Sequence, residues 1–194
     1  MTSLFATAYG IYKDMYKNLS DIKFGEMFSG GLSASVQQFK TTGKGMADAI
    51  SNLGAAATSA QVPLEEQLTI LGMLQATMEG SEAGTKYQAF ITSAANAGKE
   101  LGLQFLDANN QLKSLPEILD QLRAKYGATL DAVEKQQLTK AFGTDESVDL
   151  IDLLYPKLDQ LKGNIQSIQT AMKGGTDQTL KMAQAMNQDP GAKW

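Results

Sequence analysis

The segment Gly80-Ser-Glu-Ala-Gly-Thr85 separates two stretches of strong helical periodicity, and the rest of the chain can be interpreted outward from it. Before it, a stretch that opens at Pro63 carries apolar residues every three or four positions, which predicts a helix. Those residues are Leu64, Leu68, Leu71, Leu74 and Met78. Gly80 is expected to end this helix and Ser81 to cap the next one, which continues to Leu101. Gly84 and the Ala94–Gly98 run (AANAG) indicate places where a neighbouring helix packs closely.

The periodicity changes after Leu101. In the stretch 101–107, Leu-Gly-Leu-Gln-Phe-Leu-Asp, Leu103 and Phe105 alternate with smaller or polar residues, and turn-forming residues follow from Asp107. This pattern predicts a short two-stranded β-hairpin near 103–113. Because an isolated hairpin is marginally stable, its apolar residues are expected to be buried against the helix that begins at Ser114.

Helical periodicity returns after Ser114 and persists almost to the end. The stretch 140–147, Lys-Ala-Phe-Gly-Thr-Asp-Glu-Ser, predicts a helix that ends at Gly143 and another that Thr144 caps. A stripe with coiled-coil-like spacing follows. It consists of Leu158, Leu161, Ile165, Ile168 and Met172. Gly174-Gly175 is expected to break this helix, which leaves 174–194 as a weak helix and tail.

The N-terminal region predicts an amphipathic helix over 4–19, with a break at Thr41-Thr-Gly-Lys-Gly45. The chain is therefore divided into a helical arm (1–43), a core (44–173) and the tail. The helix carries four aromatic residues, Phe5, Tyr9, Tyr12 and Tyr16. We expect these rings to mediate self-association, with burial in the core as the competing interpretation. The fold class expected is all-α, a compact multi-helix domain with one hairpin and an N-terminal arm.

Composition excludes several classes of site. The 194 residues contain no cysteine and no histidine, so disulfides, thiol nucleophiles and histidine-based metal or triad chemistry are absent. The net charge is −4 and Arg123 is the single arginine, which argues against sequence-specific nucleic-acid binding. No apolar run reaches the roughly 18–20 residues of a membrane helix. No cofactor or metal is expected.

The carboxylates have structural explanations. Glu65/Glu66 and Asp145/Glu146 fall at predicted helix N-termini, where negative charge is stabilising. An enzyme built from this chain would rest on Glu100 or Glu117, near the predicted hairpin, as a transglycosylase acid. Both have capping or surface explanations, so the expectation is that the chain is not an enzyme.

From about Lys44 to Met172 the chain resembles the core of phage tail tape measure proteins. The resemblance rests on the order of Gly80–Thr85, the 101–107 stretch, Leu-Pro-Glu-Ile-Leu at 115–119 and Leu138–Gly143. It implies a structural protein that sets tail length and organises tail tube assembly, located in the virion tail and, during assembly, in the host cytoplasm. The implied partners are tail tube, tail-tip and chaperone proteins. Because the chain is far too short to measure a tail, it is interpreted as a fragment or truncated form. The alternative is a helical protein-interaction module, an adaptor or chaperone partner unrelated to phages.

Overall fold

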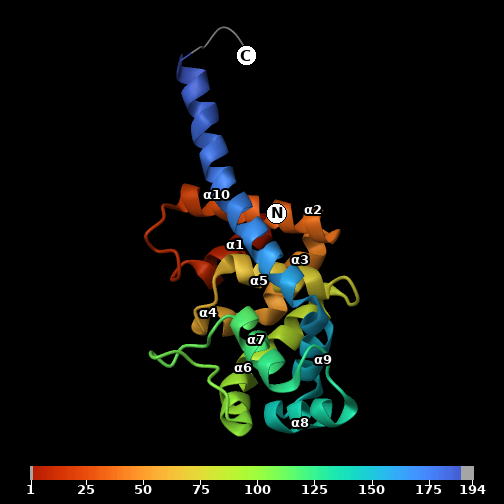
Figure 1. Ribbon diagram of the computed structural model, residues 1–194. Coiled ribbons are helices and arrows are strands. Elements are labelled where there is room, and N and C mark those ends of the chain that lie inside the picture. Colours follow the sequence, from red (N-terminus) through yellow and green to blue (C-terminus); the bar gives the residue numbers. More distant parts are fainter. Residues whose placement is uncertain (1, 189–194) are drawn as a thin grey trace.

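The structure is a computed structural model that describes residues 2–188, with side chains described for residues 6–173. Its elements are helical (Figure 1). They are α1 (Thr2–Tyr12), α2 (Asp21–Phe39), α3 (Gly43–Leu53), α4 (Ala56–Ser59), α5 (Leu64–Leu74), α6 (Gly80–Leu101), α7 (Leu115–Tyr126), α8 (Ala132–Phe142), α9 (Asp145–Leu154), the 3-10 turn η1 (Tyr155–Lys157) and α10 (Leu158–Gln188). The all-α prediction is confirmed.

Helix α5 lies at the centre of the fold. Every residue from Glu66 to Leu74 is buried, because α2, α3, α6, α9 and α10 all pack against this helix. One of these neighbours, α2, approaches closely at two glycines: the Phe39 ring of α2 covers Gly72, and Leu68 of α5 faces Gly31 of α2. A helix that is apolar nearly all round belongs in the interior of a bundle, which explains this placement.

The tightest helix pair is α3 against α6, and glycines make it possible. A Cβ on Gly84 would lie 2.3 Å from the Ala49 carbonyl oxygen, and a Cβ on Gly80 would lie 1.9 Å from that of Gly45. Asn52 of α3 also donates a hydrogen bond to the Ser81 carbonyl oxygen. The prediction of close packing at Gly84 is therefore confirmed. Gly80 and Ser81 differ from the expected caps: Gly80 is the first residue of α6, and Glu79 occupies the N-cap.

The predicted hairpin is wrong. Across 103–113 the structure contains only one isolated antiparallel bridge, between Leu106 and Leu112. The Asp107 side chain accepts the backbone N–H groups of Asn109 and Gln111, and the Gln121 side chain of α7 bonds the backbone of Gln104. Two backbone hydrogen bonds flank this bridge, from the Asp107 N–H to the Gln111 carbonyl oxygen and from the Lys113 N–H to the Phe105 carbonyl oxygen, and the pairing extends no further. The segment is therefore a loop that Gln121 holds against α7.

Helix α10 does not end at the two glycines. It continues through Gly174-Gly175 to Gln188, and Figure 1 shows its second half projecting away from the body. Two consecutive glycines lower helix propensity without forbidding the helical conformation, so the predicted break is wrong. The side chains after residue 173, and all of residues 189–194, lie outside the part that the structure describes.

The N-terminal region packs onto the rest of the chain. α2 lies along α10 and α5, and Phe24, Phe28 and Leu32 of α2 belong to the same buried apolar cluster as the residues of α5. Gly43 and Gly45 fall in the first turn of α3, which Thr42 caps through a hydrogen bond from the Gly45 N–H. The predicted glycine break is therefore a helix start. Separability of an arm over 1–43 stays a prediction, which limited proteolysis near 41–45 tests.

Replacement of Gly143 by valine is expected to destabilise the fold by more than about 1 kcal/mol, because β-branched residues resist positive φ. Gly143 has φ +78° and caps α8, with its N–H bonded to the Thr139 carbonyl oxygen. A Cβ there meets no atom within 4 Å, so backbone strain alone is tested. Urea unfolding measures the change, and an unchanged midpoint would contradict the role assigned to this cap.

Candidate functional site

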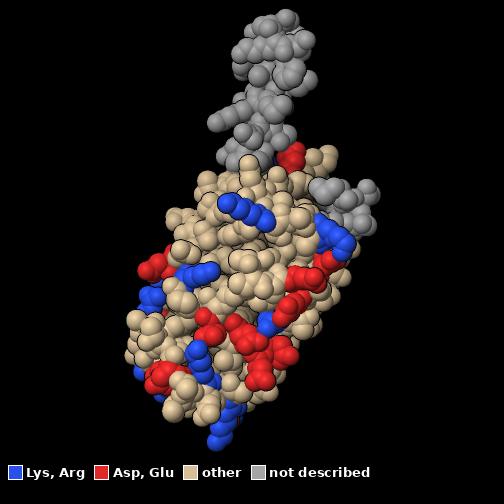
Figure 2. All heavy atoms as spheres, turned by 90° about the vertical axis from the view of Figure 1, so that its right-hand side faces the viewer, with Lys and Arg blue, Asp and Glu red and all other residues tan. Residues whose placement is uncertain are grey.

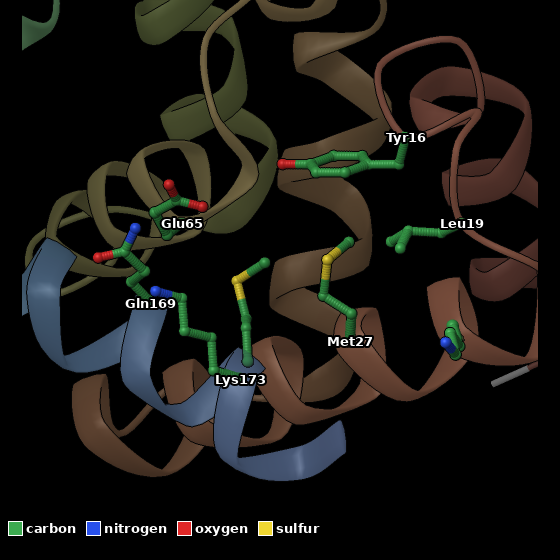
Figure 3. A pocket seen from close by; sticks show the side chains of 8 residues that line it. Tyr16, Leu19, Met27, Glu65, Gln169 and Lys173 are labelled. Carbon is green, nitrogen blue, oxygen red and sulfur yellow. The ribbon is translucent and has the colours of Figure 1, made fainter. Parts of the chain in front are cut away.

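An apolar groove opens where α10 leaves the body. Its volume is about 380 Å³, and residues of the loop after α1, of α2, of α5 and of α10 line it. Those residues are Tyr16, Leu19, Lys23, Met27, Glu65, Gln169, Met172 and Lys173. Figure 3 shows the Met27 side chain in the centre, Leu19 at one end, and Glu65, Gln169 and Lys173 grouped at the other. An apolar hollow with a few polar groups at its margin is the usual form of a binding site.

Tyr16 builds one wall of this groove and ties it to α5. Its hydroxyl oxygen accepts the backbone N–H of Leu64 at 3.0 Å. Pro63, the N-cap of α5, provides no side-chain acceptor, so the tyrosine satisfies a helix-end N–H that would otherwise lack a protein partner. Burial of the ring raises the pKa of the Tyr16 hydroxyl above its usual value. The hydroxyl therefore remains a neutral hydrogen-bonding group at physiological pH.

The structure places the four aromatic residues proposed for self-association in different surroundings. Tyr12 is fully buried, and its hydroxyl donates to Gln67 Oε1 at 2.9 Å. Tyr9 and Tyr16 are half-buried and pack beside Phe24, and the Tyr9 hydroxyl donates to Asp21. The Phe5 side chain lies outside the described residues. The premise that few local partners cover these rings is therefore wrong for the three tyrosines, although self-association itself stays a prediction.

The carboxylates singled out in the sequence do not come together in a catalytic arrangement. Glu100 is exposed near the end of α6. Glu117 is exposed in the first turn of α7, where its side chain accepts from the Ser114 hydroxyl at 2.9 Å. Asp145 and Glu146 occupy the first turn of α9, as predicted. Among the described residues, no group of three or more metal-ligating side chains lies where it could hold an ion.

Sequence reasoning missed the unusual position of Glu66. It was expected in the first turn of the helix that opens at Pro63, as a charge that stabilises the N-terminus, and it lies there but is only 5% exposed. One carboxylate oxygen accepts the backbone N–H of Leu115 at 3.1 Å, at the start of α7. Burial raises the pKa of this carboxyl to about 7, against the lowering effect of that hydrogen bond. The only feature of the sequence that indicated burial of Glu66 was its position in a segment whose apolar residues occupy more than one face of the helix.

Charged side chains on the surface are mixed. Figure 2 shows acidic side chains gathered across the lower half of one face, with lysines among them and a broad uncharged area above. Lys86 illustrates the mixing, since its Nζ lies 2.6 Å from Asp149 and 3.4 Å from Glu82. None of the helices in the described part of the chain is both long and apolar enough to span a bilayer.

Comparisons with known proteins identify the family. The family model of the phage-related minor tail protein matches residues 3–143. A tape measure protein of Pneumococcus phage Dp-1 is 27% identical over 139 residues, which cover 66% of this chain and 12% of that relative. The chain thus spans a small part of the relative's length. No solved structure matches. Because the family model covers well over half of the sequence, this chain belongs to the phage-related minor tail protein family.

Proposed function

We propose that this chain acts as part of a tail tape measure protein, as a compact helical body from which a rod-like helix emerges. The family match supports a structural role in the phage tail, and the similarity to a tape measure protein supports the finer assignment. The observation that carries the proposal is the course of α10, which first packs on α2, α5 and α7 and then leaves the body (Figure 1).

The length and anchoring of α10 fit this role. Its 31 residues correspond to a rod of about 46 Å at 1.5 Å per residue. The first half is held by Leu158, Leu161, Ile168 and Met172, all of which are buried. Because the first half of α10 packs against the body, the direction of the helix axis relative to the body is fixed. An element that extends along a tail requires such a fixed direction.

Electron microscopy of the encoding phage tests the proposal. An epitope inserted at Ala128, in the exposed turn after α7, should be labelled by immunogold in tails and not in heads. An insertion of about 60 helix-forming residues after α10 should lengthen the tail by about 90 Å. Labelled tails of unchanged length would support a tail protein that does not measure length, and unlabelled tails would contradict both assignments.

Self-association of this chain is the second part of the proposal, with tail tube, tail-tip and chaperone proteins as further partners during assembly in the host cytoplasm. Ile22 supports it, because it is 75% exposed on α2, inside the region 1–40 proposed as the contact. Exposed large apolar side chains favour interfaces when they adjoin other apolar surface. Ile22 directly precedes Lys23, one of the residues that line the apolar groove.

Light scattering at about 100 µM should detect oligomers of the full chain, since an interface of standard size binds more tightly than that. Ile22→Glu should shift the population toward monomer. Val133→Glu is the matched control, because Val133 is the other strongly exposed large apolar residue among those described, at 62%, and lies on α8. A monomeric full chain, or equal effects of the two variants, would contradict contact through 1–40.

The proposal includes no catalytic activity. A lytic enzyme would depend on Glu100 or Glu117, and both side chains are exposed. Glu117 lies in the first turn of α7 and accepts a hydrogen bond from Ser114, the N-cap of that helix. A peptidoglycan-release assay tests this point directly. Membership of a phage tail family argues against the alternative of an adaptor unrelated to phages. The apolar groove is a candidate site at which the tail protein itself would bind another protein.

A further inference from the structure

One face of α2 is left open by the other described parts of the chain. Phe24, Phe28 and Leu32 lie on the opposite face and are buried in the core. Side chains three or four residues apart share one face of a helix, and this spacing defines a polar stripe on the open face. We name it the outer stripe, and its members are half-buried in the first case and exposed in the others: Glu26, Ser29, Ser33, Gln37 and Lys40, the C-cap of α2.

The side chains of the outer stripe have no partners within the described part of the chain. On the side of α2 that faces α10, Gln38 donates to Asn164 at 2.9 Å and accepts from the Ser167 hydroxyl at 3.1 Å. The stripe side chains, by contrast, form no hydrogen bond or ion pair with the described residues. Glu26 and Lys40 are roughly 21 Å apart along the helix at 1.5 Å per residue, so these opposite charges cannot pair with each other in one copy.

The outer stripe is symmetric about Ser33. Glu26 and Lys40 lie seven positions before and after it, and Ser29 and Gln37 lie four positions before and after it. In two antiparallel copies of α2 with Ser33 opposite Ser33, each stripe residue therefore lies beside a stripe residue of the other copy. Glu26 of each copy then faces Lys40 of the second copy, and Ser29 faces Gln37, whose amide both donates and accepts. A parallel pair would place like charges together, which is unfavourable at an interface.

We propose that the outer stripe of α2 is an interface for a second copy of this chain, which packs antiparallel with Ser33 at a two-fold axis and with Glu26–Lys40 ion pairs at both ends. A two-fold contact is the arrangement in which one surface pairs with itself, and the charges of the stripe are complementary in that arrangement. The inference rests on the self-association proposed above and names its face and symmetry. Ile22 lies four positions before Glu26, so its exposed side chain continues the stripe.

Charge reversal tests the ion pairs. Lys40→Glu brings two carboxylates together at each end of the interface, and Glu26→Lys brings two ammonium groups together. Each variant alone should therefore dimerise more weakly than the wild type, by roughly tenfold or more in Kd. An equimolar mixture of the two variants restores opposite charges in the heterodimer and should recover the wild-type Kd. Analytical ultracentrifugation measures Kd, and far-UV circular dichroism checks that each variant folds.

Lys99→Glu and Glu100→Lys are the matched controls for charge reversal. Both residues are exposed on α6, and the two substitutions change the net charge by the same amounts as the test variants. They should leave Kd unchanged, alone and mixed. A general effect of net charge on association would instead appear in the controls as strongly as in the stripe variants, and this result would overturn the assigned pairing.

Cysteine cross-linking tests the register, because the chain contains no cysteine of its own. A disulfide requires Cα atoms within about 7 Å, so Ser33→Cys should form a covalent dimer on air oxidation. Ser29→Cys should cross-link to Gln37→Cys when the two are mixed, but not to itself, since its own copy lies about 12 Å further along the partner helix. Gln88→Cys, exposed on α6, controls for random collision.

The outcomes separate this inference from the self-association on which it rests. A wild-type chain that is monomeric at about 100 µM would overturn both. An oligomer that Ile22→Glu dissociates, but that keeps its Kd in Lys40→Glu and Glu26→Lys, would overturn the antiparallel α2 contact alone. Cross-linking of Ser29→Cys to itself as fast as that of Ser33→Cys would overturn the register about Ser33.

Discussion

Replacement of Gly84 by valine is expected to destabilise the chain by about 3 kcal/mol or more, the upper part of the range for overpacked cores. A Cβ at this position lies 2.3 Å from the Ala49 carbonyl oxygen and 3.0 Å from the Leu53 nitrogen, and both are backbone atoms of α3. Backbone cannot rotate away as a flexible side chain would, so α3 and α6 must separate. The separation costs packing along the most extensive helix contact in the structure.

Gly163→Ala is the matched control for this substitution. Gly163 also lies inside a helix, α10, but a Cβ there meets no atom within 4 Å. Alanine should therefore stabilise the helix by up to about 1 kcal/mol, its intrinsic advantage over glycine. Urea unfolding of the two variants separates helix propensity from packing. A neutral or stabilising Gly84→Val would show that the α3–α6 contact can relax and is not a fixed feature of the fold.

The features that sequence predicted correctly are those in which local chemistry and tertiary structure agree. Thr144 and Ser114 cap helices through their own side chains, and Gly143 has the positive φ expected of a residue after a helix. The stripe from Leu158 to Met172 is apolar because it faces the body, so its spacing revealed both the helix and its buried face. The all-α class follows from many such elements.

Three of the errors share a different cause, because each concerns a residue whose environment is set by distant parts of the chain. The loop over 103–113 has strand-like alternation, but its backbone pairing stops at a single bridge, and Gln121 of α7 holds the backbone of Gln104 instead. Glu66 looks like an ordinary first-turn carboxylate until α7 packs over it. Tyr12 has few apolar partners nearby in the sequence, but its hydroxyl donates a hydrogen bond to Gln67, which lies 55 residues later in the chain. A single sequence does not contain these pairings.

Truncation of Phe105 to alanine is expected to cost about 3–5 kcal/mol, the range for a fully buried phenylalanine. The ring is 1% exposed although it belongs to a loop, and its centroid lies 6.4 Å from that of Phe142, which stacks in turn on Phe90 at 5.3 Å. Phe105 thus joins the loop to α6 and α8, rather than packing only on α7 as expected. Leu103 and Leu112, predicted to be buried with it, are half-buried, so Leu103→Ala should cost clearly less.

A double-mutant cycle with Gly98 makes this prediction specific to packing. A Cβ on Gly98 would lie 2.9 Å from Cγ of Phe105, so Gly98→Ala should destabilise the wild type. In Phe105→Ala the ring is gone, but Cβ of residue 105 still lies 3.0 Å from the new methyl group, so the same change should cost less than in the wild type, offset in part by the helical advantage of alanine, up to about 1 kcal/mol. Urea unfolding of the four proteins measures the coupling, and contacting residues typically couple by about 0.5–3 kcal/mol. Strictly additive effects would mean that the Phe105 ring does not rest on α6 at this glycine.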